Sequence, residues 1–371
     1  MANPYTGVAA YDTYGGAGGW GVEEGMTTLT NGSFPESCSP IAAAMVPSMK
    51  TLVTGGAGFI GSHIVDRLVA RGDAVTALDD LSTGSLSNLT QHADAAAVRI
   101  VEGTILDEQL VDHLIESHDR VFHLAAAVGV AHILAHPLRS LLTNSRGSEN
   151  VLAACARHGR KVVVASSSEV YGKTDRVPMR EDDDRVLGST TVPRWSYSTA
   201  KALDEHLALA YAAGGLRTAI VRYFNIYGPR MDPRGYGSVM ANFLRQATSG
   251  EALTVYGDGT QTRCFTYVDD CVDGTLLAMD TAVAEGQVIN IGNRAMETSV
   301  AELARLIVET SGSDSRIEFE SYESHFGPAF EDTRRRVPST ERATQLLGWT
   351  ASIGLVDGLR RTLDWWSTGR A

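Results

Sequence analysis

The sequence predicts an α/β fold built on a doubly wound parallel sheet. Two observations predict it. Short, almost wholly apolar segments alternate with segments of helical periodicity, as expected of parallel strands that are buried on both faces and joined by helices. A glycine-rich turn also stands between the first of these strands and the first helix, which is how such sheets begin.

The composition excludes several classes of protein. With 371 residues, the chain can bury one large core or two domains. A net charge of −12 argues against nucleic acid or an anionic membrane as the main partner. No apolar run approaches the roughly 18 residues that span a bilayer. The cysteines lack the spacing of a metal site or a disulfide framework, so we expect no metal and a reduced, cytoplasmic setting. They are Cys38, Cys155, Cys264 and Cys271.

The first 48 residues differ from the rest of the chain. Residues 1–48 include the glycine-rich run 15–19 and show no period of 2 or 3.6. We expect a flexible amino-terminal extension, because termini are often loose. Met49, directly before the first strand, would also make a natural start of the chain. The functional alternative is an arm that packs on a subunit or a lid.

The glycine-rich turn has the spacing of a phosphate-binding loop. Strand 51–54 runs into Gly55, Gly58 and Gly61, and a helix is expected over about 62–71. The glycines permit a tight turn and a close approach to a pyrophosphate, which the helix amino terminus favours. This is the start of a Rossmann dinucleotide site. Its predicted contacts are Gly55, Gly58, Phe59, Ile60 and Gly61.

Acidic residues at the end of the second strand select the dinucleotide. Strand 74–78 ends in Asp79 and Asp80. An acid about 20 residues beyond the glycines suits hydrogen bonding to the ribose diol and repels a 2′-phosphate. We therefore predict NAD rather than NADP, with a solvated acidic turn as the alternative.

Two further strands are expected to approach the cofactor. Segment 98–107 ends in Asp107, which could contact adenine or cap the following helix, and both possibilities stay open. Strand 120–124 runs into Ala125, whose small side chain lets the chain pass close to a cofactor. His123 is expected to be a packed core histidine rather than a catalyst.

Five residues form the predicted catalytic group. Ser167, Ser168 and Glu169 follow a buried strand, where ligands of doubly wound sheets bind. Tyr197 and Lys201 are four apart, so they share one helical face. A phenol has a reference pKa of about 10, but a lysine ammonium and the positive nicotinamide would favour the phenolate. Tyr197 could then take a proton from a sugar hydroxyl.

Taken together, these motifs resemble the extended short-chain dehydrogenase/reductase superfamily of nucleotide-sugar enzymes. The resemblance covers nearly all of 49–366. It implies an NAD-binding Rossmann domain over 49–225 and a smaller carboxyl-terminal α/β domain over 226–371. The second domain would mainly bind the nucleotide sugar, with some segments returning to the Rossmann sheet. The further matching segments are 222–230, 255–263, 265–270, 290–293 and 347–349.

The resemblance also implies a substrate-binding set. Asn225, Tyr256 and Arg263 would lie near the diphosphate and base. Arg336 matches an Arg-x-Pro position of the family and would offset substrate charge. The complete set is Glu169, Asn225, Arg230, Tyr256, Gln261, Arg263 and Arg336.

The strand end favours one reaction of the superfamily. Sugar 4,6-dehydratases carry Thr-Asp-Glu, and a serine at the Asp position is a poor proton donor. The familiar 4-epimerases usually lack the glutamate. UDP-glucuronate decarboxylases carry Thr-Ser-Glu, which Ser167, Ser168 and Glu169 resemble. Oxidation at C4 of a glucuronate gives a β-keto acid, which loses carbon dioxide readily. We therefore predict decarboxylation of UDP-glucuronate through a 4-keto intermediate, with Ser168 and Glu169 ordering the carboxylate site and supplying a proton at C5.

Several alternatives stay open at this point. Segment 192–197 resembles the decarboxylase domain of the bacterial lipid A aminoarabinose pathway and the plant apiose/xylose synthases, so the product is UDP-xylose or a UDP-4-keto-pentose. A 4-epimerase, a 4,6-dehydratase and a non-catalytic NAD-binding regulator are the rival functions. Glu169 could bind protonated or lie on the far face of the sugar. Relatives commonly form homodimers through the Tyr197 helix and the helix around 137–158.

Overall fold

The structure is a computed structural model that describes most of the chain after residue 47. The predicted extension 1–48 lies, apart from Ser48, outside the described residues. The described part of 47–371 forms one compact unit. The described residues are 48–93, 95–129, 133, 136–232, 238–323 and 333–368.

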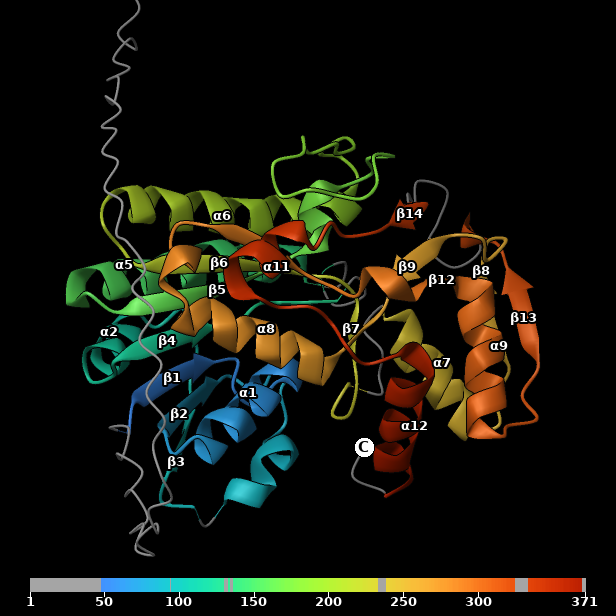
Figure 1. The fold of residues 1–371 in the computed structure, drawn as a ribbon, viewed down its shortest axis with the longest axis horizontal. Coiled ribbons are helices and arrows are strands. Elements are labelled where there is room, and N and C mark those ends of the chain that lie inside the picture. Colours follow the sequence, from blue (N-terminus) through green and yellow to red (C-terminus); the bar gives the residue numbers. More distant parts are fainter. Residues whose placement is uncertain are drawn as a thin grey trace, which may run out of the picture. The chain divides into compact units, whose positions relative to one another are not determined.

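A seven-stranded parallel sheet forms the centre of this unit (Figure 1). Its strand order is β11-β6-β5-β4-β1-β2-β3, so the order of the chain reverses between β1 and β4. This confirms the predicted doubly wound sheet, whose ligands bind outside the carboxyl ends of the strands at such a reversal. The strands are β1 Lys50–Thr54, β2 Ala74–Asp79, β3 Val98–Glu102, β4 Arg120–His123, β5 Lys161–Ser167, β6 Thr218–Tyr223 and β11 Val288–Ile291.

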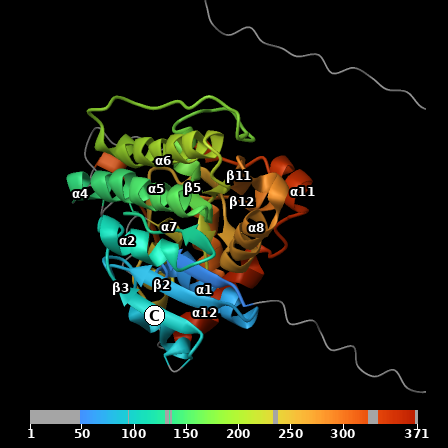
Figure 2. The same cartoon turned by 90° about the vertical axis from the view of Figure 1, so that its left-hand side faces the viewer.

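Helices cover both faces of the sheet (Figure 2). One layer contains α2, α5 and α6, and the other contains α1, α8 and α11. Within β5, Val162 and Val164 pack into the core on one face while Val163 packs into the core on the other. This alternation explains why the strand is apolar throughout. The helices are α1 Phe59–Ala70, α2 Glu108–Glu116, α4 Pro137–Leu142, α5 Ser148–His158, α6 Ser196–Ala213, α8 Val268–Asp280 and α11 Glu341–Leu347.

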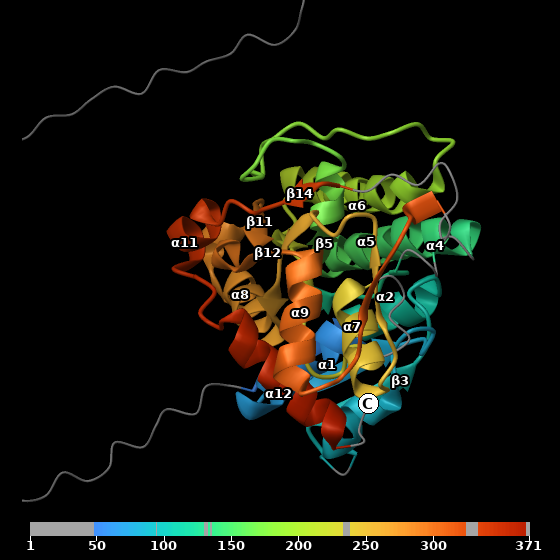
Figure 3. The same ribbon diagram turned by 90° about the vertical axis from the view of Figure 1, so that its right-hand side faces the viewer.

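Three small sheets lie beside the carboxyl ends of the main strands, together with α7, α9 and α12 (Figure 3). They pair β7 with β10, β8 with β13, and β9 with β12 and β14. Between them the chain returns to the main sheet as β11, next to β6. The elements are β7 Ile226–Tyr227, α7 Val239–Thr248, β8 Leu253–Tyr256, β9 Thr262–Cys264, β10 Thr266–Tyr267, β12 Glu297–Ser299, α9 Val300–Ser311, β13 Ile317–Glu320, β14 Arg335–Arg336 and α12 Leu355–Ser367.

The helix predicted over 137–158 is not uniform. A π-helical turn, Thr143–Gly147, joins α4 to α5. A Cβ atom on Gly147 would come within 2.4 Å of the Ile105 side chain, so the helix passes close to the chain after β3. Among the described helices, none has both the length and the apolar character required to cross a bilayer. The 3-10 helices are Leu86–His92, Ser168–Tyr171, Pro193–Trp195, Ala282–Ala284 and Arg294–Met296.

Candidate active site

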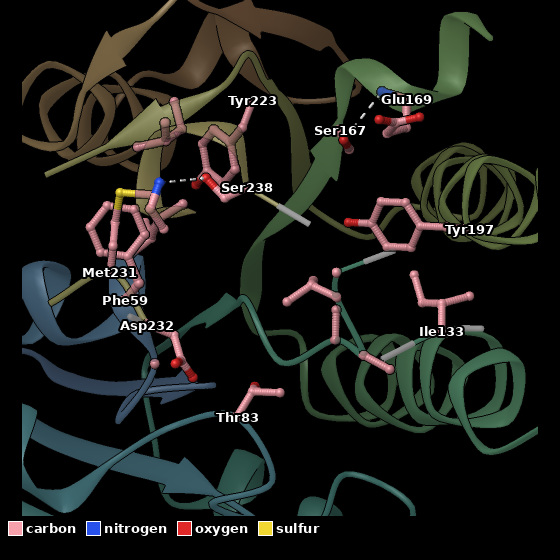
Figure 4. Close-up of a pocket in the computed structure, with 18 of the residues that line it drawn as sticks. Phe59, Thr83, Ile133, Ser167, Glu169, Tyr197, Tyr223, Met231, Asp232 and Ser238 are labelled. Carbon is pink, nitrogen blue, oxygen red and sulfur yellow. Dashed lines mark hydrogen bonds between the residues drawn. The ribbon is translucent and has the colours of Figure 1, made fainter. Parts of the chain in front are cut away.

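A large cavity lies at the carboxyl ends of the central strands. Its volume is about 1020 Å³, at the upper end of the range of about 300–1,000 Å³ typical of small-molecule sites. Figure 4 shows part of it, with Phe59 near one end and Tyr197 and Glu169 near the other. The cavity is therefore large enough to consider two ligands side by side, one on the glycine turn and one toward the small sheets.

The glycine turn forms one end of the cavity. Gly58 precedes α1 and supplies no side-chain cap, so the amide groups of the first helical turn face this end of the cavity. A Cβ atom on Gly61 would lie 2.0 Å from the carbonyl oxygen of Gly55. The turn therefore requires glycine at this position and offers an anion site to a pyrophosphate. The predicted residues Gly55, Gly58, Phe59, Ile60 and Gly61 all line the cavity.

Asp79 also lines the cavity, at the end of β2. Its Oδ2 accepts a hydrogen bond from the Ala57 amide (3.0 Å) and its Oδ1 accepts one from the Leu81 amide (2.9 Å). Burial raises the pKa of its carboxyl group, and these amides oppose that rise. Asp79 thus braces the glycine turn, and the remaining lone pairs can accept from a ribose diol.

Of the other two predicted cofactor contacts, Ala125 lines the cavity and Asp107 does not. Ala125 lines the cavity directly after β4. Asp107 is absent from the described lining; it is the amino-terminal cap of α2, and its Oδ1 accepts a hydrogen bond from the Leu110 amide (3.0 Å). Of the two roles that the sequence left open, the structure places Asp107 in the capping role.

Tyr197 and Lys201 both line the cavity from the first turns of α6. The hydroxyl of Tyr197 points into the cavity (Figure 4). Burial raises the pKa of Tyr197; Lys201 and the Ser167 hydroxyl oppose that rise without cancelling it. Burial lowers the pKa of Lys201, but the Asp204 carboxylate, 3.0 Å from its Nζ, together with Tyr197 and Glu205 outweighs burial and raises that pKa. These groups therefore favour a charged Lys201 close to the phenol.

Glu169 is held between two arginines. Its carboxylate accepts hydrogen bonds from both terminal nitrogens of Arg194 (2.8 and 3.1 Å) and from Arg336 (2.7 Å). The arginine side chains are buried, with 7% and 4% of their surface exposed. We call these three residues the arginine clamp. Burial alone would raise the pKa of Glu169, but Arg336 and Arg194 outweigh it and hold the pKa well below its ordinary value.

The clamp bears on two expectations about Glu169. Two guanidinium groups favour its ionised form, which speaks against a protonated Glu169 and against its supplying the proton at C5. Its backbone amide donates to the hydroxyl of Ser167 (3.2 Å), and Ser168 lines the cavity with 2% of its surface exposed. Both serines and the clamped carboxylate therefore line the same cavity as Tyr197.

The predicted substrate residues line the cavity, with one exception. Asn225, Tyr256, Gln261, Arg263 and Arg336 line it. Arg230 is absent from the described lining, and its guanidinium pairs with Asp66 of α1 (2.6 Å).

Asn225 has a positive φ of 44°, a conformation that asparagine tolerates better than most residues. Gln261 donates to the backbone carbonyl of Tyr256 (3.1 Å) and to the hydroxyl of Tyr322 (2.8 Å). These contacts fix a pair of tyrosine rings, Tyr256 and Tyr322, whose centroids are 6.3 Å apart. Tyrosine rings at this end suit a flat nucleobase.

The sequence identifies the family of this chain. Residues 51–292 match the model of the "NAD dependent epimerase/dehydratase family". The chain belongs to this family. NAD is accordingly its cofactor, in agreement with the prediction from the glycine turn and Asp79. The recognised superfamily of nucleotide-sugar enzymes is confirmed as well.

Two relatives in the family span most of the chain. UDP-N-acetyl-alpha-D-glucosaminuronate decarboxylase of Bacillus cytotoxicus is 42% identical over 317 residues, which cover 85% of this chain and 97% of the relative. UDP-glucuronic acid decarboxylase 1 of Xenopus tropicalis is 34% identical over 335 residues, covering 90% and 76%. The crystal structure of UDP-glucuronic acid 4-epimerase of Bacillus cereus, solved with UDP-glucuronic acid and NAD, is 28% identical with a TM-score of 0.77, covering 86% and 99%.

Three residues in or directly behind the site were not predicted from the sequence. Arg194 stands three positions before Tyr197, a helical spacing that could have suggested a shared face. Asp204 stands three positions after Lys201, which gives the same signal. No motif marked Tyr322, because it meets Gln261 only through the pairing of β13 with β8.

Proposed function

We propose that this chain catalyses the NAD-dependent decarboxylation of UDP-glucuronate through a 4-keto intermediate, giving UDP-xylose. One observation carries the proposal, namely the arginine clamp beside Tyr197. Within the clamp, two guanidinium groups face one carboxylate, so the three side chains carry a net charge of +1. A C6 carboxylate would balance this charge, whereas the hydroxymethyl group of a neutral hexose would not.

The first step belongs to Tyr197. As the phenolate, it takes the proton of the sugar 4-hydroxyl while the hydrogen on C4 leaves as hydride. Bound NAD⁺ accepts that hydride and returns it later, and its positive nicotinamide adds to Lys201 in favouring the phenolate. The glycine turn, Asp79 and Ala125 would hold the dinucleotide, since all of them line its end of the cavity.

Loss of carbon dioxide then needs little from the protein. The C5–C6 bond of the β-keto acid breaks and its electron pair enters the C4 carbonyl, giving an enolate. Tyr197, now protonated, and the Ser167 hydroxyl can donate hydrogen bonds to the enolate oxygen. Because Glu169 is ionised, the proton at C5 has to come from another donor, for which Ser168 or a water molecule beside it is available. Tyr197 finally returns its proton to O4 as the ketone is reduced.

The uronate itself has a second candidate. The Bacillus cytotoxicus relative, 42% identical, is named for a uronate with an N-acetyl group. Both sugars carry the C6 carboxylate that the clamp fits, so the clamp does not distinguish them. The similar 4-epimerase structure keeps retention of all six carbons as a rival outcome.

The test is to incubate the full chain with UDP-glucuronate or UDP-N-acetylglucosaminuronate, with and without added NAD⁺. We expect carbon dioxide release and a product lighter by the mass of carbon dioxide. A product a further two hydrogens lighter, with NADH accumulating, would identify a released keto-pentose. An isomer of unchanged mass would replace decarboxylation by 4-epimerisation. The sugar with the higher kcat/KM identifies the substrate.

We further propose that the chain forms a homodimer through α4 and α6. These helices pack together on one side of the molecule (Figure 2). They expose Leu138 (69% of its surface), Leu142 (45%) and Leu203 (45%), and exposed leucines grouped in this way indicate a covered face. Sedimentation should give a dimer for the native chain and a monomer after Leu138→Glu and Leu203→Glu. A native monomer at micromolar concentration contradicts the proposal.

The domain boundaries and the compartment also remain proposals. A cofactor domain over 49–225 and a mainly substrate-binding domain over 226–371 agree with the division of the cavity into two ends. The thiols of Cys155, Cys264 and Cys271 are free and buried, which supports a reduced, cytoplasmic setting. Fractionation of cells that express the chain would test the compartment.

A further inference from the structure

A buried carboxylate lies directly behind the catalytic pair. Asp204, one turn beyond Lys201 on α6, accepts a hydrogen bond from the Lys201 ammonium at 3.0 Å. The side chains have 0% and 4% of their surface exposed, so water does not replace either partner. An ion pair at this depth needs further polar contacts to offset desolvation.

A chain of hydrogen bonds from three other elements leads toward Asp204. The Thr54 hydroxyl, at the end of β1, lies 2.8 Å from Nδ1 of His123 on β4, and Nε2 of His123 lies 3.1 Å from the Ser148 hydroxyl on α5. Burial raises the pKa of Asp204, while Lys201 and, more weakly, the Ser148 hydroxyl lower it, and the second carboxylate oxygen, Oδ1, has no hydrogen-bond partner among the described residues. All of these side chains are buried.

In this chain each group donates its hydrogen bond in the direction from Thr54 toward Ser148. Thr54 already accepts a hydrogen bond from the Ala125 amide (3.2 Å), so its own proton is available to Nδ1 of His123. A neutral His123 then donates from Nε2 to Ser148 and leaves the serine proton for Asp204. Burial, together with Lys201, lowers the pKa of His123 to about 3, in agreement with a neutral ring. The hydrogen-bonded chain therefore begins at the cofactor loop and reaches Ser148, whose hydroxyl acts on the pKa of Asp204.

The neighbouring Glu205 does not serve Lys201 in place of Asp204. Its two carboxylate oxygens accept hydrogen bonds from the Arg222 guanidinium, at 2.8 and 2.7 Å, and the Ser166 hydroxyl also donates to it. Its charge is thereby largely matched. Asp204 is the carboxylate in direct contact with the lysine ammonium.

We propose that Asp204 is a positioning residue, which Ser148 and His123 hold in place so that Lys201 stays charged and directed at Tyr197. The proposal rests on the roles given above to Tyr197 and Lys201, but not on the identity of the sugar. In this proposal His123 acts on Ser148 and not on the substrate.

Several titratable groups act on this pair. Asp204, Tyr197 and Glu205 on α6 raise the pKa of Lys201, and burial lowers it. On β4, His123 is neutral, and Glu169 acts on Tyr197 from the 3-10 helix after β5. Removing the charge of Asp204 leaves burial with the smaller opposing contributions, so the pKa of Lys201 should fall.

The experiment measures the charge state of Lys201 directly. Brief pulses of acetic anhydride at a series of pH values acetylate the uncharged amine, and mass spectrometry of the full chain after digestion gives the rate at Lys201. In Asp204→Asn, which keeps a hydrogen-bond acceptor but removes the charge, Lys201 should become reactive at a pH about two units lower than in the native chain. Ser148→Ala should shift it in the same direction by less.

The matched control is Asp270→Asn. Asp270 is another buried carboxylate, on α8, whose oxygens accept from the Ser352 and Ile353 amides at 3.0 Å. The Asp270→Asn variant should have a lower melting temperature but the same pH dependence of acetylation at Lys201. An unmoved profile in Asp204→Asn, or an equal shift in Asp270→Asn, overturns the proposal. If Asp204→Asn does not fold, the proposal is overturned when Ser148→Ala leaves the pH dependence of Lys201 acetylation unchanged.

Turnover provides the second readout. Asp204→Asn should lower kcat by about tenfold or more at neutral pH while the KM for the UDP-sugar changes little, because Asp204 does not line the cavity. A raised KM at unchanged kcat would contradict a positioning role. The labelling needs no sugar, so its result is independent of whether the proposed decarboxylation is correct.

Discussion

Replacing Glu169 with glutamine tests the arginine clamp most directly. The variant keeps the shape of the side chain but removes its charge, so Arg194 and Arg336 are left buried without the carboxylate that accepts their three hydrogen bonds. Removing one partner of a buried ion pair costs about 3–5 kcal/mol, and the amide oxygen recovers part of this, so we expect about 3 kcal/mol. For a unit of the size of residues 47–371, unfolding entropy is about 0.7 kcal/mol per degree, which converts the loss to about 4 °C.

The assay is thermal unfolding with and without ligand. UDP-glucuronate should raise the melting temperature of Glu169→Gln more than that of the native chain, because its C6 carboxylate replaces the missing charge. UDP-glucose has no carboxylate and should stabilise both chains equally. If the variant is as stable as the native chain, or if both ligands stabilise it equally, the proposed role of the clamp is wrong.

The difference between the two chains should also depend on pH. The pKa of Glu169 is depressed in the folded state, so its contribution to stability is complete above the unfolded value of about 4.3 and is lost as the pH falls toward the lower folded value. We therefore expect a constant difference in melting temperature from pH 7 to about 5 and a smaller one below that.

The control is Glu297→Gln. Glu297 also accepts two hydrogen bonds from one arginine, Arg335 (2.6 and 2.8 Å), but that arginine is half-exposed and outside the described lining of the cavity. Surface pairs contribute about 0–1 kcal/mol, so its melting temperature should fall by no more than about 1 °C.

Three further variants test other parts of the site. Tyr197→Phe should lower turnover by about 10²-fold or more with unchanged NAD affinity by calorimetry, and near-native turnover would remove it as the base. Gly61→Ala, whose Cβ would meet a backbone oxygen at 2.0 Å, should weaken NAD binding by about tenfold or more, whereas Gly354→Ala, with open space around it, should not. Arg263→Met should raise the KM for the UDP-sugar, because Arg263 lines the cavity. Arg230→Met should lower only the stability, because Arg230 pairs with Asp66 outside the described lining. A raised KM in Arg230→Met with an unchanged KM in Arg263→Met would restore Arg230 as a substrate contact.

The sequence by itself determined the features that depend on neighbours along the chain. The glycine turn joins one strand to the next helix, so its spacing is visible in seven residues, Gly55–Gly61. Tyr197 and Lys201 share a face because a helix repeats every 3.6 residues. The apolar strands are recognisable because both faces of a parallel sheet are buried. These local rules were enough to predict the fold and the cofactor, and to propose Tyr197 and Lys201 as the acid–base pair.

Only the tertiary structure decided how the charges combine. Glu169 meets Arg194 from 25 residues away and Arg336 from 167 residues away, and Arg230 meets Asp66 across 164 residues. No spacing along the chain encodes such pairs, because the sheet and the small sheets beside it bring them together. A carboxylate that is protonated in one environment is ionised between two guanidiniums, so the state of Glu169 follows from the packing of distant segments and not from its own motif.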